Sequence, residues 1–315
     1  MVNDTFGRKS LTRILLDINN FQVLWIPDLT CSAIILQLEL SRINFCYYTT
    51  QDGALDENSL KSIVPDNNDV LLVTHHFGKV ENISSHTRIK FLAVIEDYTQ
   101  VLFSWRDLRN LPLYSFSSFR KYTNLKGGSL SILKNSNDPH FSNTSFFTII
   151  SVVKAFVLEI GLLKWIYNFT QYSKSSGLSN SQIISPVKSN EFCRISFVEI
   201  LIIKWSCFKL NTTSIYISNF LFRAFRLKIK NEQYNSFFCY LDSNKISQRQ
   251  INLLRIMGFR IYRWPDLCDL SHDNAFKFRE DYIILGYDIP LFTFTIILIE
   301  YVCYKFTRYW FKRCD

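Results

Sequence analysis

The residues with the clearest chemical potential in this chain are one aspartate and one lysine. Asp97 ends the apolar run in IEDYTQ, and Lys121 follows in SSFRKYTNLKGGS. Gly127 and Gly128, two of only nine glycines in the chain, come shortly after the lysine. The aspartate and the lysine are either ordinary surface charges or two halves of a cofactor site.

A lysine and an aspartate held together are the groups that an aldehyde cofactor requires. Lys121 would form a Schiff base with pyridoxal phosphate, and Asp97 would keep the pyridine nitrogen protonated so that the ring can accept electrons. Ser118, with Ser115 or Ser117 as helpers, would offer a hydroxyl to the phosphate, and the glycine pair would let the backbone approach closely. On spacing alone, the favoured interpretation is a strand-end carboxylate and a surface lysine, because short motifs often arise by chance.

Short apolar runs separated by segments of helix length or less dominate the first half of the chain. Apolar runs without polar alternation predict strands that are buried on both faces, which is typical of a layered α/β sheet. Ligands bind at the carboxyl ends of the strands in such sheets, and Asp97, His75 and His76 all occupy such ends. The predicted strands cover residues 22–27, 43–49, 69–77, 91–97, 113–117 and 128–133.

The amino-acid composition of the chain changes after Leu133. Asn/Ser-rich linkers and long apolar stretches follow, and they predict a mainly helical region up to residue 230. Strand-like and helix-like runs then alternate, which predicts a smaller α+β domain. We therefore predict a large domain over residues 1–230 and a small one over residues 231–315, with elements at 236–243, 247–258, 259–265 and 281–290.

Composition limits the partners and the compartment. The chain has 315 residues, 48% of them hydrophobic, which is enough for a sizeable core, and its net charge of +9 suits anionic partners such as phosphorylated cofactors. The eight cysteines have no zinc-like spacing, which indicates reduced thiols and no metal site. The charged N-terminus lacks the apolar core of a signal peptide, so a cytoplasmic protein is predicted.

Three apolar stretches raise the question of membrane spans. Charged residues interrupt two of them and the other is short, whereas a spanning helix needs roughly 20 largely uncharged residues. Core helices are therefore predicted, with membrane contact at most peripheral, through the aromatic and basic C-terminal end. The three stretches cover residues 146–167, 197–208 and 289–306.

Six short motifs stand in order along the chain: FGRKSLTRIL (6–15), WIPDLTCSA (25–33), VTHHFG (73–78), VIEDYTQ (94–100), FSSFRKYTNLKGG (116–128) and RWPDL (263–267). Together they resemble the DegT/DnrJ/StrS family of pyridoxal-phosphate sugar aminotransferases, in particular a divergent branch from surface-polysaccharide gene clusters. The likeness is good up to residue 133 and weaker beyond it. It implies the aspartate-aminotransferase-like fold (fold type I), a three-layer α/β sandwich with a smaller C-terminal α+β domain.

The resemblance implies roles for three residues around the cofactor ring. Lys121 would bind the cofactor covalently and shuttle the α-proton of the substrate. Asp97 matches the carboxylate that pairs with the pyridine nitrogen. Gln100 matches the position that contacts the ring hydroxyl.

Further matched positions concern the phosphate and the face of the ring. Gly7 and Arg8 match a turn whose backbone amides, at a helix N-terminus, hold the phosphate, and Ser118 would complete that cup. Cys31, next to Thr30, falls where the family places a residue against the ring, although a thiol cannot stack as an aromatic ring does. For the strand-end histidine at position 75, a functional role and a role in satisfying backbone groups are both open.

Two functions from different classes follow. The first is a cytoplasmic, homodimeric aminotransferase that moves an amino group from glutamate to a nucleotide-linked keto sugar for surface polysaccharide (O-antigen or exopolysaccharide) and binds no nucleic acid. The second is a binding or accessory protein with a decayed pocket, peripheral to the membrane. The family's Asn/Arg segment has no counterpart between residues 135 and 172, which favours the second function, whereas the retained Lys121 favours the first.

Overall fold

A seven-stranded sheet forms the larger part of the fold. The computed structural model describes residues 2–4, 7–51, 54–102, 111–118, 129–133, 197–229, 238–263, 273–286, 289 and 293–303. In the order β1-β9-β8-β7-β6-β2-β3, the sheet contains β1 (Val2–Asp4), β2 (Leu24–Pro27), β3 (Phe45–Tyr48), β6 (Val70–Thr74), β7 (Ala93–Asp97), β8 (Ser115–Ser118) and β9 (Ser129–Ile132).

The central strands of this sheet run in the same direction. Five strands, β3, β2, β6, β7 and β8, pair in parallel. At one side of the sheet, β9 pairs antiparallel with β8, and β1 pairs antiparallel with β9. The carboxyl ends of the parallel strands therefore lie along one edge of the sheet. The connecting elements include α1 (Gly7–Ile18), α2 (Ser32–Leu40), α3 (Glu57–Ser62), the 3-10 turn η1 (His76–Gly78), α4 (Ser85–Arg88) and the hairpin of β4 (Thr50–Gln51) with β5 (Ala54–Leu55).

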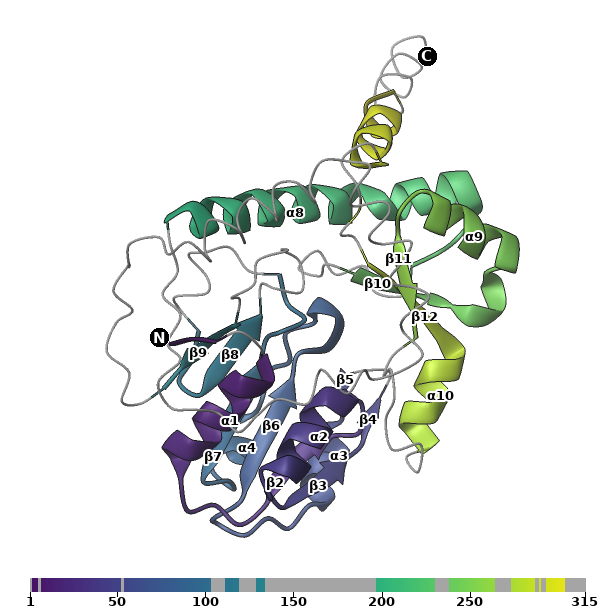
Figure 1. Cartoon of the computed structure of the whole chain (residues 1–315). Coiled ribbons are helices and arrows are strands. Elements are labelled where there is room, and N and C mark those ends of the chain that lie inside the picture. The colour runs from purple at the N-terminus through teal and green to yellow at the C-terminus, as the bar shows by residue number, and fades with distance from the viewer. Residues whose placement is uncertain are drawn as a thin grey trace.

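Both faces of the large sheet carry a hydrophobic core. On one face, Leu24, Val70 and Ile95 lie in a cluster with buried residues of α1 and α2. On the other face, Leu71 and Val94 lie in a cluster with buried residues of α3. Successive residues of a strand point to opposite faces, so strands without polar alternation are covered on both sides. The sheet with its helices (Figure 1) forms the predicted three-layer α/β arrangement.

A second, three-stranded sheet lies in the C-terminal part of the chain. Its antiparallel strands have the order β10-β12-β11. Its buried residues share one core cluster with Leu210 and Ile217 of the long helix α8, and with Leu29 and Phe77 from loops of the large sheet. The elements are α8 (Phe197–Phe225), β10 (Phe238–Asp242), η4 (Ser243–Lys245), α9 (Gln248–Ile256), β11 (Arg260–Tyr262), α10 (Asp273–Asp281), β12 (Tyr282–Gly286) and a helix at 293–303 (Figure 1).

Most predicted strands agree with the observed ones, but the short strands β4 and β5 were not predicted, and two strands of the large sheet also differ. The run predicted at 69–77 ends as a strand at Thr74, and a 3-10 turn follows from His76. The edge strand β1 was not predicted, because its three residues form a strand by pairing with β9. The domain boundary at residue 230 stays a prediction. No helix in the described ranges is long and apolar enough to cross a membrane.

Candidate functional site

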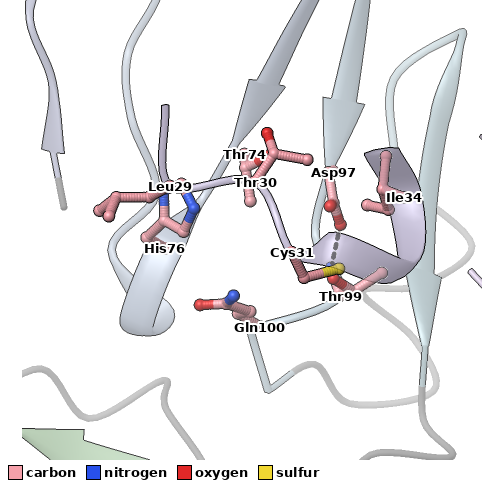
Figure 2. Close-up of a pocket in the computed structure, with 9 residues that line it drawn as sticks. All are labelled: Leu29, Thr30, Cys31, Ile34, Thr74, His76, Asp97, Thr99 and Gln100. Atoms are coloured by element: carbon pink, nitrogen blue, oxygen red, sulfur yellow. Dashed lines mark hydrogen bonds between the residues drawn. The ribbon is translucent and has the colours of Figure 1, made fainter. Parts of the chain in front are cut away.

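Three neighbouring parallel strands end around one small open pocket (Figure 2). Strands β2, β6 and β7 are adjacent in the sheet, so the loops that follow them meet at one edge. Asp97 ends β7, and both Asp97 and His76 line this pocket, as the strand-end argument predicts. The lining residues are Leu29, Thr30, Cys31, Ile34, Thr74, His76, Asp97, Thr99 and Gln100.

The Asp97 carboxylate is buried at the pocket and is fixed by its own loop. Asp97 is only 2% exposed, and its Oδ1 accepts a hydrogen bond of 2.7 Å from the backbone N–H of Thr99. It pairs across the sheet with Thr74 and Phe116, so its side chain lies on the face that α1 and α2 cover. A buried carboxylate in this position can stabilise a cationic group bound in the pocket.

Gln100 contributes a second oriented polar group. Its side chain is buried, and its Oε1 accepts a hydrogen bond of 3.0 Å from the backbone N–H of Phe77. Because the Gln100 oxygen is bonded to that backbone group, the amide nitrogen is the donor that this side chain can offer to a molecule in the pocket. A nitrogen donor at this position fits a ring hydroxyl or its anion.

The N-terminus of α1 lies directly against the end of β7. Helix α1 begins at Gly7, where a Cβ atom would lie 3.1 Å from Thr99 Cγ2 and 3.6 Å from the Phe116 ring. The missing side chain thus allows the helix N-terminus to approach the pocket. The first N–H groups of a helix lack intrahelical partners and favour an anion such as phosphate.

Arg8 follows Gly7 in the first turn of α1 and adds a positive charge there. Burial lowers the pKa of the Arg8 guanidinium, and its electrostatic interaction with Cys31, a pocket residue, opposes that shift. Cys31 is also the N-cap residue of α2. The predicted residues Gly7, Arg8, Cys31, Asp97 and Gln100 therefore converge on one region.

The serines of β8 divide between the two faces of the sheet. Ser118 is buried and shares the face of Phe116, which is also the face of α1, although it does not line the pocket. Ser115 and Ser117 point to the other face, where their hydroxyls donate to backbone oxygens of Pro112 and Tyr98. The suggestion that these two help to bind phosphate is therefore wrong, because they lie on the far side of the sheet.

The lysine predicted to bind the cofactor lies outside the described residues. The same is true of Gly127 and Gly128, which follow it in the sequence. The role of Lys121 therefore stays a prediction. Within the described ranges, no cluster of histidine, cysteine or carboxylate side chains could hold a metal ion.

The pocket residues fit the chemistry of pyridoxal phosphate. The buried Asp97 suits a protonated ring nitrogen, and the Gln100 amide suits the ring hydroxyl. The N-terminus of α1, which Gly7 allows to approach the pocket, and the nearby Arg8 suit a phosphate. Four residues that line the pocket, Leu29, Ile34, Thr74 and Thr99, were not predicted from the sequence. Thr99 could have been found, because it stands between the predicted residues Asp97 and Gln100.

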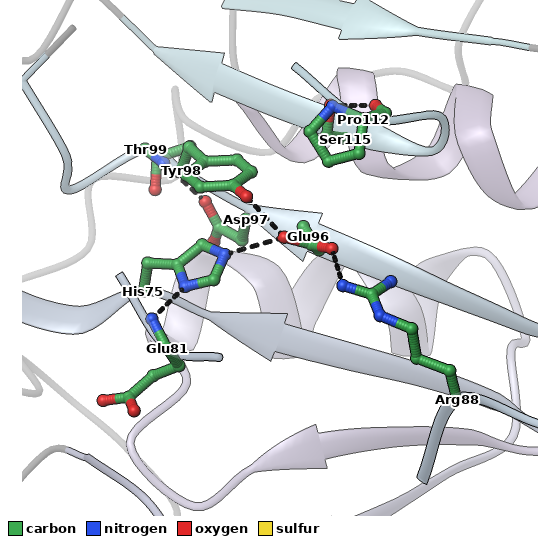
Figure 3. A network of polar contacts seen from close by, with 9 residues as sticks. All are labelled: His75, Glu81, Arg88, Glu96, Asp97, Tyr98, Thr99, Pro112 and Ser115. Carbon is green, nitrogen blue, oxygen red and sulfur yellow. Dashed lines mark hydrogen bonds and ion pairs between the residues drawn. The ribbon is translucent and has the colours of Figure 1, made fainter. Parts of the chain in front are cut away.

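A polar network lies behind the site, on the opposite face of the sheet (Figure 3). Glu96 precedes Asp97 in β7, so its side chain points away from the pocket. Its carboxylate accepts hydrogen bonds from Arg88 and Tyr98 and contacts His75 Nε2 at 3.2 Å. The Glu96 carboxylate is thus held by three partners.

His75 is a structural residue of this network. Its Nδ1 accepts a hydrogen bond of 3.0 Å from the Glu81 backbone N–H, so the neutral ring carries its hydrogen on Nε2 and donates to Glu96. The ring is fully buried and stacks on Tyr98 with 4.1 Å between centroids. Of the two interpretations of His75, the structure supports the one in which it satisfies buried polar groups, whereas His76 faces the pocket.

The Glu96→Gln variant is expected to lose about 2 to 3 kcal/mol of unfolding free energy at neutral pH, because charged hydrogen bonds are lost. Burial opposes ionisation of Glu96, but its bonds from His75, Tyr98 and Arg88 lower its pKa from 4.5 to about 2. The stabilisation is therefore complete above pH 4.5 and is lost as the pH falls towards about 2. Urea unfolding of both proteins between pH 3 and 7 measures the difference.

Glu280→Gln is the matched control for this prediction. It removes the same charge from a pair with Arg263 (3.8 Å) in which the Glu280 side chain is 54% exposed. A surface pair contributes at most about 1 kcal/mol, so this variant should unfold almost as the wild type does. Equal losses in both variants would contradict the role assigned to the Glu96 network.

Comparison with known proteins gives structural neighbours and no match by sequence. No family model matches the chain, and no curated protein matches it in sequence. A Streptococcus pneumoniae protein described as a sugar aminotransferase has a TM-score of 0.52 at 11% identity, over 96% of this chain and 87% of that one. A Helicobacter pylori aminotransferase involved in the biosynthesis of pseudoaminic acid has a TM-score of 0.51 at 14% identity, over 94% and 83% of the two chains.

A third neighbour has been solved with the cofactor. GDP-4-keto-6-deoxy-D-mannose-3-dehydratase of E. coli, with bound hydrated PLP, has a TM-score of 0.53 at 13% identity, over 94% of this chain and 84% of that one. At such identities the likeness establishes the fold. The predicted aspartate-aminotransferase-like fold is therefore confirmed, and the activity has to be argued from the site.

Proposed function

We propose that this chain is a pyridoxal-phosphate-dependent aminotransferase of the DegT/DnrJ/StrS family. The observation that carries the proposal is the meeting of the buried Asp97 carboxylate, the Gln100 amide and the N-terminus of α1 at one edge of a parallel sheet. The three groups match the ring nitrogen, the ring hydroxyl and the phosphate of one cofactor. The fold shared with sugar aminotransferases supports the same conclusion.

Three residues of the proposed site have defined tasks. Bound pyridoxal phosphate supplies an electron sink for the electrons released at the substrate α-carbon. Asp97 would keep the ring nitrogen protonated, and Gln100 would donate to the ring hydroxyl. Lys121 would bind the cofactor covalently and take the proton from the α-carbon of the amino donor.

The N-terminus of α1 would hold the phosphate. Its first backbone N–H groups would donate to the phosphate oxygens, and Arg8 would add a positive charge. Ser118, on the same face of the sheet, contributes its hydroxyl. Cys31 lies at the pocket where the family places a residue against the ring, so the ring stacks less strongly here than on an aromatic side chain.

The substrate that the proposal names is a nucleotide-linked keto sugar, with glutamate as the amino donor. The neighbours include a GDP-linked keto sugar dehydratase and an aminotransferase of pseudoaminic acid biosynthesis, which supports this substrate class. A role in surface polysaccharide biosynthesis, a cytoplasmic location and a homodimer with sites near the interface belong to the same proposal. The large cofactor-binding domain would end near residue 230.

The glutamate half-reaction tests this function without knowledge of the sugar. Protein loaded with pyridoxal phosphate should have a visible absorbance band, and glutamate should bleach it while one equivalent of 2-oxoglutarate forms. A keto sugar nucleotide should then restore the band. A coloured protein that glutamate never bleaches would exclude amino transfer and favour the binding or accessory function.

A further inference from the structure

Phe77 stands in an unusual backbone conformation next to the pocket. It is the middle residue of the turn η1, with φ 56° and ψ 29°, and it is 3% exposed. A bulky residue in the left-handed region is uncommon and is strained, so other contacts must hold it there. Gly78 follows with φ 80°, which glycine adopts readily.

The side chain of Phe77 is held by helix α10 and by strand β10 of the small sheet. Its ring stacks on Phe278 of α10 at 5.2 Å between centroids and lies 5.1 Å from Tyr240 and 5.6 Å from Phe238, both in β10. Aromatic pairs at such distances are favourable beyond the burial of their area. Three rings from the C-terminal part of the chain thus fix a residue in a loop of the large sheet.

The backbone of Phe77 is directed towards the pocket. Its N–H donates to Gln100 Oε1 at 3.0 Å, and the preceding residue, His76, lines the same pocket as Gln100. One residue thus links the small sheet to a pocket side chain, because its ring contacts the small sheet and its N–H holds Gln100.

We propose that Phe77 is a positioning residue through which helix α10 and the small sheet set the orientation of Gln100. With the ring of Phe77 held by Phe278 and β10, the turn keeps its N–H on Gln100 Oε1, and the Gln100 amide nitrogen then faces the bound molecule. Loosening of the aromatic contacts lets the turn leave its left-handed conformation and releases Gln100. The benefit to cofactor binding rests on the proposed function, whereas the coupling itself does not.

Amide hydrogen exchange at Phe77 tests the coupling without any cofactor. Phe278→Leu removes the stacked ring, and Gln100→Ala removes the acceptor, so both should speed exchange of the Phe77 amide about tenfold, as expected for the loss of one hydrogen bond. Phe259→Leu is the matched control, because Phe259 is buried in the same core cluster at 2% exposure but belongs to the loop before β11. It should leave that exchange rate within about twofold of the wild type.

The same variants then test the consequence for cofactor binding. Phe278→Leu and Gln100→Ala should each weaken pyridoxal phosphate binding about tenfold, and the double variant should be no weaker than Gln100→Ala alone. Additive losses in the double variant, or an equal effect of Phe259→Leu on exchange, would overturn the inference. A wild type that binds no cofactor but shows the predicted exchange pattern would overturn the proposed function and leave the coupling established.

Discussion

The Asp97→Asn variant is expected to slow the glutamate half-reaction by about 100- to 1,000-fold, because the loss of one partner from a buried charge pair costs several kcal/mol. A neutral amide cannot hold the proton on the ring nitrogen, so the ring withdraws electrons less strongly. The substituted side chain keeps an oxygen that can accept the Thr99 N–H bond, and the fold should therefore survive. Stopped-flow absorbance after addition of glutamate measures the rate.

Glu96→Gln is the matched control for this experiment. It removes a carboxylate from the neighbouring position of the same strand, but on the opposite face of the sheet. The two variants should separate the two roles: Asp97→Asn loses rate and keeps most of its stability, whereas Glu96→Gln loses stability and keeps the rate of the folded protein. A normal half-reaction in Asp97→Asn would contradict the assignment of the ring carboxylate.

The second large effect is expected for Lys121→Ala. Loss of a general acid and base slows a proton transfer by roughly 100- to 10,000-fold, and loss of the covalent link should remove the visible band altogether. Lys245→Ala, at an exposed lysine of η4, is the control and should keep both band and rate. Absorbance spectra and single-turnover rates of the three proteins measure these effects. A visible band that persists in Lys121→Ala would assign the covalent link to another lysine.

Much of the large sheet could be predicted from the sequence, because its strands carry apolar residues on both faces. Val70 to Val73 all lie in the core, which explains why this run lacks polar alternation. The strand-end rule placed Asp97 at the pocket for the same reason, since the carboxyl ends of parallel strands meet at one edge. The polar strand β1 offered no such pattern.

Side-chain direction was harder to predict than position. His75 and His76 are adjacent, and the sequence alone did not decide which of them faces the pocket. Pairing of Thr74 with Asp97 puts these two residues on one face, and the turn after β6 then brings His76 to the pocket and His75 to Glu96. The contact of Phe77 with Phe278 of α10 joins residues about 200 positions apart, which no local pattern encodes.

Borohydride trapping tests the central claim most directly. Wild-type protein is mixed with pyridoxal phosphate, reduced with borohydride and digested, and the modified peptide is identified by mass spectrometry. The proposal predicts a visible band before reduction and one pyridoxyl group on Lys121 after it. A protein that stays colourless and carries no adduct on Lys121 would contradict the proposal.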